Sequence, residues 1–197
     1  MPKGEIRVGP WRRGGSGAEQ SIRVRFAEHE LQVLRTLSRS VLDWFAERRN
    51  SEPSDELAEL TGIRTGHTEP PSSAALRRLL PDMCHPDDEG TDSAEVRELN
   101  AAMRGLHEPE VLEAKEGAGR VFLDSLPEHA GEVVLTLDEA KSWVAALNDL
   151  RLTLGSILGV APDTPERLPP GHPHAAQLGV YHWLTVLQES LLIALTR

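Results

Sequence analysis

The sequence predicts a mainly α-helical bundle of about four long helices, with a small antiparallel sheet formed by an N-terminal hairpin and one later strand. Apolar residues recur every three or four positions over several long stretches, a spacing typical of helices with one buried face. Short alternating segments, typical of strands, precede two of these stretches. Residues 179–197 are apolar on nearly every side, so we expect them to form the central helix of the bundle.

The chain of 197 residues carries a formal net charge of −10 that is unevenly distributed. Residues 1–25 hold six Lys or Arg and two Glu, a net charge of +4, which leaves −14 for the remainder. An acidic body argues against a broad phosphate-binding surface, because such surfaces cluster Lys and Arg. The one cysteine, Cys84, excludes an internal disulfide and a cysteine-rich zinc site.

Two further patterns bear on location. The N-terminus lacks the apolar core of a signal peptide. The C-terminal stretch is interrupted by Gln188 and Glu189 and falls short of the ~20 apolar residues that span a membrane. We therefore expect a cytoplasmic protein without a membrane segment.

The N-terminal part changes from strand to helix periodicity. Residues 4–9 and 21–26 alternate apolar and polar side chains, and we expect them to pair as a hairpin across the Gly- and Arg-rich loop 10–20. From Ala27 the period becomes about 3.6, which predicts the first long helix, to about Asn50.

Residues 51–92 form a Pro- and Gly-rich insertion in what we predict to be a single domain, 1–197. Two short helices fit inside it: Ser54 can cap one that runs to Leu60, and either Ser72 or Ser73 can cap another that runs to Leu80. So long a stretch with this little regular structure is uncommon in a compact domain unless it serves a function or is disordered.

Four helices and one strand follow the insertion. Asp92 is expected to cap a helix to Leu106, and Pro109, which suits a first helical turn, to begin a separate helix to Leu126. The remaining expected elements are the strand 132–137, a helix 139–158 capped by Asp138, a Pro-rich loop 159–173 and the C-terminal helix.

Charged residues gather at three places that are candidates for binding. Arg77 and Arg78 form a small basic point that either contacts a phosphate or an acidic partner, or pairs with local acids. A second basic patch is either a nucleic-acid arm or a solvated hairpin, and it comprises Arg7, Trp11, Arg12, Arg13, Arg23 and Arg25. The third is a polar network between helices or a structural ion pair, drawn from Asn148, Asp149, Arg151 and Glu189.

The loop 82–89 surrounds Cys84 and His85 with four carboxylates. Oxygen ligands in a loop can hold a divalent cation, but the spacing is not that of an EF-hand, and a solvated acidic loop is the alternative. No P-loop, GxGxxG, HExxH or GxSxG pattern occurs in the chain. We therefore expect no catalytic residues, no cofactor and no metal, and a metal-dependent enzyme using this loop is the last of three hypotheses.

Five stretches resemble a family of proteins of unknown function from high-GC Gram-positive bacteria. They are PSDELAELTGIRTGH (53–67), LRRLLPD (76–82), LHEPEVLEAK (106–115), LNDLRLTLG (147–155) and YHWLTVLQESLL (181–192). Members of this family are often described as transcriptional regulators, and their genes often lie near the gene for the ClpS adaptor. The resemblance implies a regulator and brings no catalytic residues with it. Its motifs include the insertion residues that we expect to bind a partner, which are Arg64, His67, Arg77, Arg78 and Asp82.

We therefore expect a non-enzymatic cytosolic regulator, linked to transcription through protein–protein contacts. Direct DNA binding through the Arg-rich hairpin and the Arg77–Arg78 pair is the second hypothesis, although residues 62–71 are too long and Pro-rich for the turn of a helix-turn-helix.

For assembly we expect a homodimer, because large exposed apolar patches are rare on monomers. The expected seam is a flank of the C-terminal helix with Tyr181, Gln188 and Leu192. A monomer in which the insertion folds over these residues is the alternative.

Overall fold

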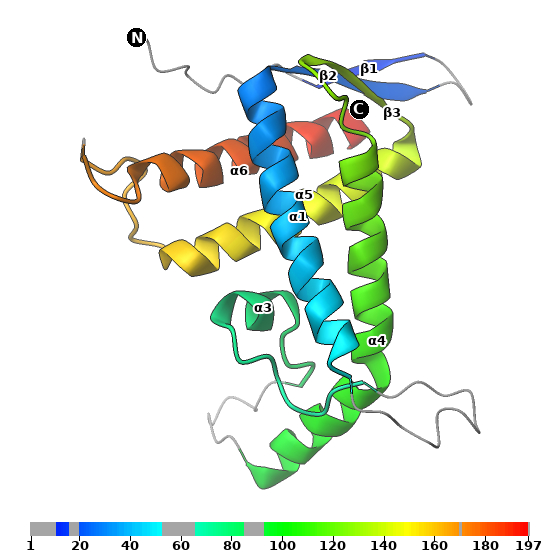
Figure 1. The fold of residues 1–197 in the computed structure, drawn as a ribbon, viewed down its shortest axis with the longest axis vertical. Coiled ribbons are helices and arrows are strands. Elements are labelled where there is room, and N and C mark those ends of the chain that lie inside the picture. Colours follow the sequence, from blue (N-terminus) through cyan, green and yellow to red (C-terminus); the bar gives the residue numbers. More distant parts are fainter. Residues whose placement is uncertain (1–10, 16–19, 53–65, 85–92, 170, 197) are drawn as a thin grey trace.

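The computed structural model describes residues 11–15, 20–52, 66–84, 93–169 and 171–196. These residues form helices of one bundle and a small sheet at one end of its long axis (Figure 1). The elements are β1 (Arg12–Gly14), β2 (Ser21–Phe26), α1 (Glu28–Asn50), α3 (Ala74–Leu79), α4 (Ala94–Asp124), β3 (Gly131–Leu135), α5 (Leu137–Leu158) and α6 (Ala175–Thr196). The predicted fold class, mainly α with a small antiparallel sheet, is confirmed. The division into one domain with an insertion stays a prediction.

The sheet has the order β1-β2-β3, and both pairings are antiparallel. Its inner face buries Ile22, Val24 and Phe26 of β2, as the alternation predicted. The expected partner strand 4–9 lies outside the described residues. Where we predicted only a loop, β1 pairs with β2, so that part of the prediction is wrong. The Arg-Arg-Gly of β1 has no alternation of its own, and its position is fixed by the free edge of β2 and by the buried Trp11 beside it.

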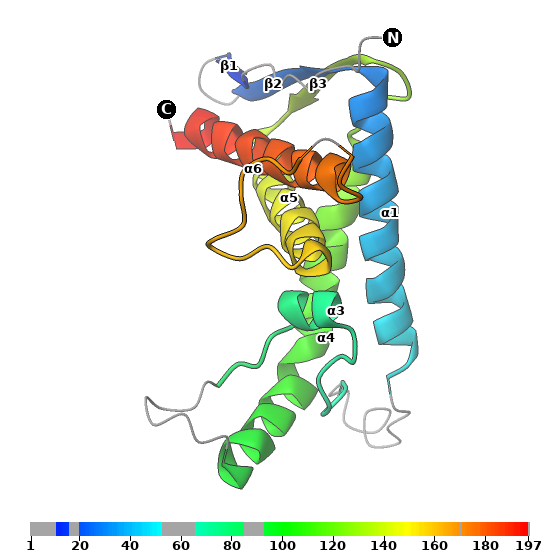
Figure 2. The ribbon, with the colours of Figure 1, turned by 90° about the vertical axis from the view of Figure 1, so that its left-hand side faces the viewer.

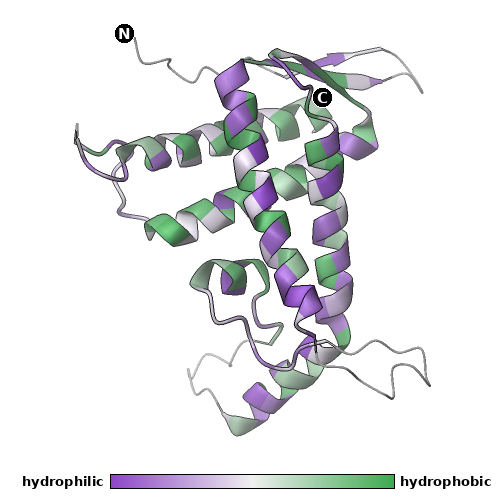
Figure 3. Ribbon diagram, in the orientation of Figure 1, coloured by the Kyte–Doolittle hydropathy of each residue, from purple (hydrophilic) through white to green (hydrophobic). Residues whose placement is uncertain are grey.

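The central helix is α5, which packs against α1, α3, α4 and α6 and also touches β2 and β3. The prediction that the C-terminal helix would be central is wrong. One side of α6 is fully buried at Leu184, Leu187 and Leu191, but Val186 and Ile193 on the other side remain about half exposed, at 51% and 49%. Figure 3 shows that α5 and α6 are the most hydrophobic helices, while α1 and α4 alternate between hydrophobic and hydrophilic residues. An all-round apolar sequence therefore did not mean all-round burial.

By length and composition, α6 is one helix that could cross a membrane. It begins at Ala175, four residues before the expected start, which gives it 22 residues. The core helix of a soluble protein passes the same test, and Trp183, Leu184 and Leu187 of α6 lie in the core. The absence of a membrane segment stays a prediction.

A single helix, α4, runs through Pro109, where we predicted two helices and a break. Its N-cap is Ser93, whose Oγ accepts from the Val96 N–H at 3.2 Å, and not Asp92. Proline has no N–H, so the carbonyl of Gly105 one turn earlier loses its helical partner. The N–H of Gly66, from the insertion, donates to that carbonyl at 2.7 Å. A contact with a distant segment thus keeps the helix continuous.

The caps of α5 also differ from expectation. Thr136, not Asp138, is the N-cap, and its Oγ1 accepts from the Glu139 N–H while the Glu139 carboxylate accepts from the Thr136 N–H. The helix ends at Gly159, which adopts the left-handed conformation (φ 63°) that favours glycine. These two caps fix both ends of α5, the helix on which the other described helices pack.

The predicted dimer seam is partly occupied within the chain. Gln188 is buried, and its Nε2 donates to the Val144 carbonyl at 3.1 Å. Tyr181 packs against α5, where a Cβ on Gly155 would lie 3.0 Å from its ring. Only Leu192 of the three is exposed, at 43%. The seam as predicted is therefore wrong in composition, and the homodimer itself stays a prediction.

Candidate functional site

The segment 66–84, which contains α3, lies against the C-terminal end of α1 and the first half of α4, with α3 packed on α5 (Figures 1 and 2). Ala75, Leu79 and Leu80 are its buried apolar contacts. Of the two serines expected to cap α3, Ser73 does so, by accepting from the Leu76 N–H. Six residues of helix, these three side chains and the buried Pro71 are a small apolar area for holding such a segment, so its polar contacts matter.

Three charged side chains of α1 and α4 and one of the segment itself form what we call the charge cluster. They are Arg48, Arg104 and Glu108, with Asp82 from the segment. Glu108 lies at its centre and accepts from Arg48 Nε at 2.7 Å and from Arg104 Nη1 at 2.6 Å. The side chains of Glu108 and Arg104 are only 2% and 4% exposed. Asp82 accepts from Arg104 Nη2 at 2.7 Å and balances the second guanidinium. The cluster is neutral as a whole, which is how buried charges are tolerated.

The charge cluster also binds the backbone of the segment. Arg48 Nη2 donates to the Glu69 carbonyl at 2.6 Å, and Arg104 Nη1 donates to the Leu80 carbonyl at 3.1 Å. His67 Nε2 donates to the Arg48 carbonyl at 2.9 Å. Beyond α3, the side chain of Asn100 bonds the Cys84 N–H and carbonyl, both at 2.8 Å. Charged and amide groups on α1 and α4 therefore hold the segment along its length.

The segment meets α4 at Gly66, where a side chain would not fit. A Cβ at Gly66 would lie 2.8 Å from Pro109 Cγ, so we expect Gly66→Ala to push the segment off α4 and to break the bond to the Gly105 carbonyl. Amide hydrogen exchange in residues 66–84 should become faster in this variant, while exchange in α5 stays slow.

The matched control is Gly117→Ala. Gly117 lies in α4, the helix that Gly66 contacts, and has open space around its missing Cβ. This change should stabilise the protein by about 0.5–1 kcal/mol, because alanine is the better helix former. Equal exchange in the two variants would show that Gly66 does not hold the segment.

The structure divides the predicted interaction residues into two groups. His67 and Asp82 bond to α1 and α4 and so hold the segment in place. Arg77 and Arg78 are exposed on α3, and the bond that Arg77 Nε makes among the described residues, at 3.1 Å, goes to the nearby Pro71 carbonyl. Arg64 lies outside the described residues. Thus the basic pair is the part of the predicted set that faces solvent.

Sequence reasoning missed Arg48, Arg104 and Glu108. Arg104 and Glu108 stand four apart on one face of a helix, a spacing that brings two charges together. This signal was present, but it is common on solvated helices. Their burial depends on a segment that folds back over them.

The predicted polar network between helices is two separate pairs. Lys115 Nζ donates to Asp149 Oδ1 at 2.7 Å and joins α4 to α5. Arg151 Nη2 donates to Asn148 Oδ1 at 3.2 Å within α5. Glu189 is exposed and has no ion pair among the described residues.

Burial raises the pKa of Asp149 above its ordinary value of 3.8, and Lys115 partly opposes this shift. At pH values between 3.8 and the raised pKa, Asp149 is protonated more often in the folded state than in the unfolded state. The contribution of Asp149 to stability is therefore full below pH 3.8 and declines as the pH rises through this window. Asp149→Asn should remove the decline, and urea unfolding of both proteins at several pH values between 4 and 7 would measure it.

Asp138→Asn is the control for this measurement. Asp138 is exposed, and a hydrogen bond and charge attraction from Lys141 lower its pKa. Any contribution of Asp138 to stability therefore depends on pH with the opposite sign, because it is lost as the pH falls. If wild type and Asp149→Asn showed the same pH dependence of unfolding, burial would not govern the titration of Asp149.

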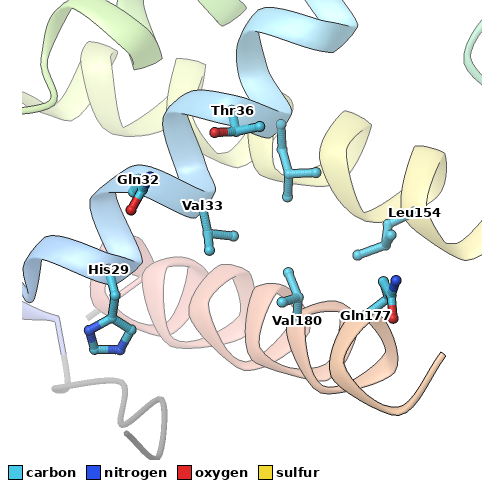
Figure 4. Close-up of a pocket in the computed structure, with 8 residues that line it drawn as sticks. His29, Gln32, Val33, Thr36, Leu154, Gln177 and Val180 are labelled. Atoms are coloured by element: carbon cyan, nitrogen blue, oxygen red, sulfur yellow. The ribbon is translucent and has the colours of Figure 1, made fainter. Parts of the chain in front are cut away.

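Three of the hollows on the surface of the described residues have volumes of about 380 to 450 Å³. Two flank the charge cluster, one of about 380 Å³ beside Leu80 and Met83 and one of about 450 Å³ beside Glu69 and Asn100. The third, of about 440 Å³, lies between α1, α5 and α6, with Val33, Leu154 and Val180 as apolar walls (Figure 4). Its lining holds one titratable residue, His29, and one hydroxyl, that of Thr36, and among the described residues no hydrogen bond joins the two.

The predicted acidic loop falls mostly outside the described residues. Asp82 is engaged with Arg104, and Cys84 is half-buried. Within the described parts of the chain, no three His, Cys, Asp or Glu side chains are placed to hold a metal ion. The described residues therefore offer no metal site that would support the hypothesis of a metal-dependent enzyme.

Comparison with known proteins gives the family. Residues 8–195 match the model of DUF2017, a domain of unknown function. The chain belongs to this family. It is 45% identical to proteins named oxidative stress regulator AosR from Mycobacterium tuberculosis and Mycobacterium bovis, over 98% of this chain and 93% of each relative. No solved structure matches the chain. Neither finding bears on the ClpS gene or on transcription, which stay predictions.

Proposed function

We propose that this member of the DUF2017 family is a non-enzymatic regulator of the response to oxidative stress, linked to transcription through contacts with a protein partner. The names of relatives that match over nearly the whole chain support the regulatory part of this proposal. An internal disulfide cannot be the sensor in this chain, because Cys84 is its only cysteine.

The observation that carries the protein-contact part is the way the segment 66–84 is held. Buried charges and backbone bonds fix it to α1 and α4, while Arg77 and Arg78 project from its helix. A rigid support lowers the entropy lost on binding, and arginine is enriched in protein interfaces. The exposed pair thus suits recognition of carboxylates on a partner.

Affinity capture from native lysate, quantified by mass spectrometry, tests the proposal. The wild type should recover a defined partner, and Arg77→Glu with Arg78→Glu should lose it. The matched control is Arg39→Glu with Arg167→Glu, which makes the same change in net charge at two other exposed arginines. Failure to recover any partner, together with measurable turnover of a metabolite, would overturn the proposed function. Retention of the partner by the Arg77/Arg78 variant would overturn only the assignment of the surface.

A further inference from the structure

The outer face of the three-stranded sheet carries a second arginine surface. Residues that alternate with the buried ones point away from the helices, and the register sets them in rows. Arg12 lies opposite Arg23, Arg23 opposite Val134, and Arg25 opposite Glu132. All five are exposed, Val134 at 49%. We call these five residues the outer sheet face.

Positive charge on this face is not neutralised within the described residues. Arg23 is 4.0 Å from Glu132, while Arg12 and Arg25 have no ion pair there. Two like charges directly opposite each other on neighbouring strands destabilise a sheet. The neighbouring Arg13 behaves differently, since it points to the other side and donates to Gln20 Oε1 at 2.6 Å and to the Leu195 carbonyl at 3.5 Å. Arg13 thus makes hydrogen bonds within the chain, whereas the side chains of Arg12 and Arg25 make none among the described residues.

We infer that the outer sheet face binds an acidic segment of another protein, one that also carries an apolar side chain. Three arginines with only one glutamate beside them attract carboxylates, and the exposed Val134 on the edge strand β3 offers an apolar contact next to Arg23. Arginines beside an apolar contact are typical of a protein interface. This face lies at the sheet end of the molecule, away from the segment 66–84, so the inference does not depend on the surface assigned above (Figure 1).

Two features favour a protein over a nucleic acid. Val134 is exposed within the face and would gain nothing from contact with phosphates, whereas an apolar side chain of a protein segment can pack on it. The chain as a whole carries a net charge of −10, which opposes a long polyanion more than a short acidic segment.

Fluorescence anisotropy with a labelled peptide tests this inference. The probe is a short peptide in which pairs of glutamates alternate with leucines, compared with the same peptide carrying serine in place of leucine and with a short random DNA duplex. The glutamate–leucine peptide should bind saturably and more tightly than the other two probes. Arg12→Ser with Arg25→Ser should weaken its binding about fivefold or more, because two ion pairs are lost. Val134→Thr should weaken it about fourfold, through a lost apolar contact.

The matched control is Arg39→Ser with Arg167→Ser, which removes the same charge from exposed sites outside the face and should leave binding unchanged. If this control weakened peptide binding equally, the loss would follow from net charge and not from the outer sheet face, and the inference would be overturned. Tighter binding of the DNA duplex, lost in the Arg12/Arg25 variant, would make the face a nucleic-acid surface instead. Absence of saturable peptide binding would also overturn it, whatever partner the capture from lysate recovers.

Discussion

Glu108→Gln should lower the free energy of unfolding by about 3 kcal/mol, although it changes one atom of the side chain. The carboxylate of Glu108 is 2% exposed and accepts from both Arg48 and Arg104. A neutral amide in its place leaves two guanidiniums in a buried site with one partner, Asp82, which is half exposed. Urea unfolding monitored by circular dichroism measures the change.

Glu110→Gln is the control for this prediction. Glu110 is exposed on the same helix, two residues further on, so its change should cost less than about 0.5 kcal/mol. A second readout is amide exchange in residues 66–84, which should accelerate in Glu108→Gln before the bundle unfolds, because the charge cluster binds the Glu69 and Leu80 carbonyls. Similar unfolding free energies for the two variants would mean that the charge cluster does not stabilise the fold.

Trp143→Ala should cost about 3–5 kcal/mol, because it removes the largest fully buried side chain of the core. The ring of Trp143 on α5 packs on Phe122 of α4 at 4.2 Å between centroids, on Trp11 at 5.4 Å and on Phe26 of β2 at 6.0 Å. One side chain thus joins the helices to the sheet. Thermal and urea unfolding would measure the loss.

Two further variants separate the causes. Trp143→Phe keeps an aromatic ring but loses the bond from Nε1 to Ser125 Oγ at 2.7 Å, and should cost less than the alanine variant. Trp44→Ala, at a half-buried position on α1 with no ring partner among the described residues, should cost less still. An equal loss for Trp44→Ala and Trp143→Ala would show that the sheet–helix junction is not the centre of the core.

The two largest effects fall at two separate sites, one on α5 and one on α4. Trp143 fixes the sheet, whose outer face carries Arg12, Arg23 and Arg25, and Glu108 fixes the segment that carries Arg77 and Arg78. Both proposed binding surfaces therefore depend on buried groups behind them. Variants on the surfaces should change binding and leave stability nearly unchanged.

The sequence by itself located the helical stretches, though not all of their ends, and the buried side of the sheet. The spacing of apolar residues located α1 to within one residue of its start, and the sequence narrowed the cap of α3 to Ser72 or Ser73, of which the structure uses Ser73. The alternation in β2 correctly assigned Ile22, Val24 and Phe26 to the core. These features depend on neighbours within one or two turns of chain, so a local pattern contains them.

Tertiary structure decided where these elements meet. Pro109 predicts a break from local rules, but Gly66, far away in the chain, supplies the missing hydrogen bond and α4 continues. Glu108 meets Arg48 across 60 positions of sequence, and only the fold makes that glutamate a buried one. Likewise, α5 is central because four helices and two strands pack on it, not because it is the most apolar. Such contacts join residues distant in sequence, and a local pattern holds no record of which distant groups will come together.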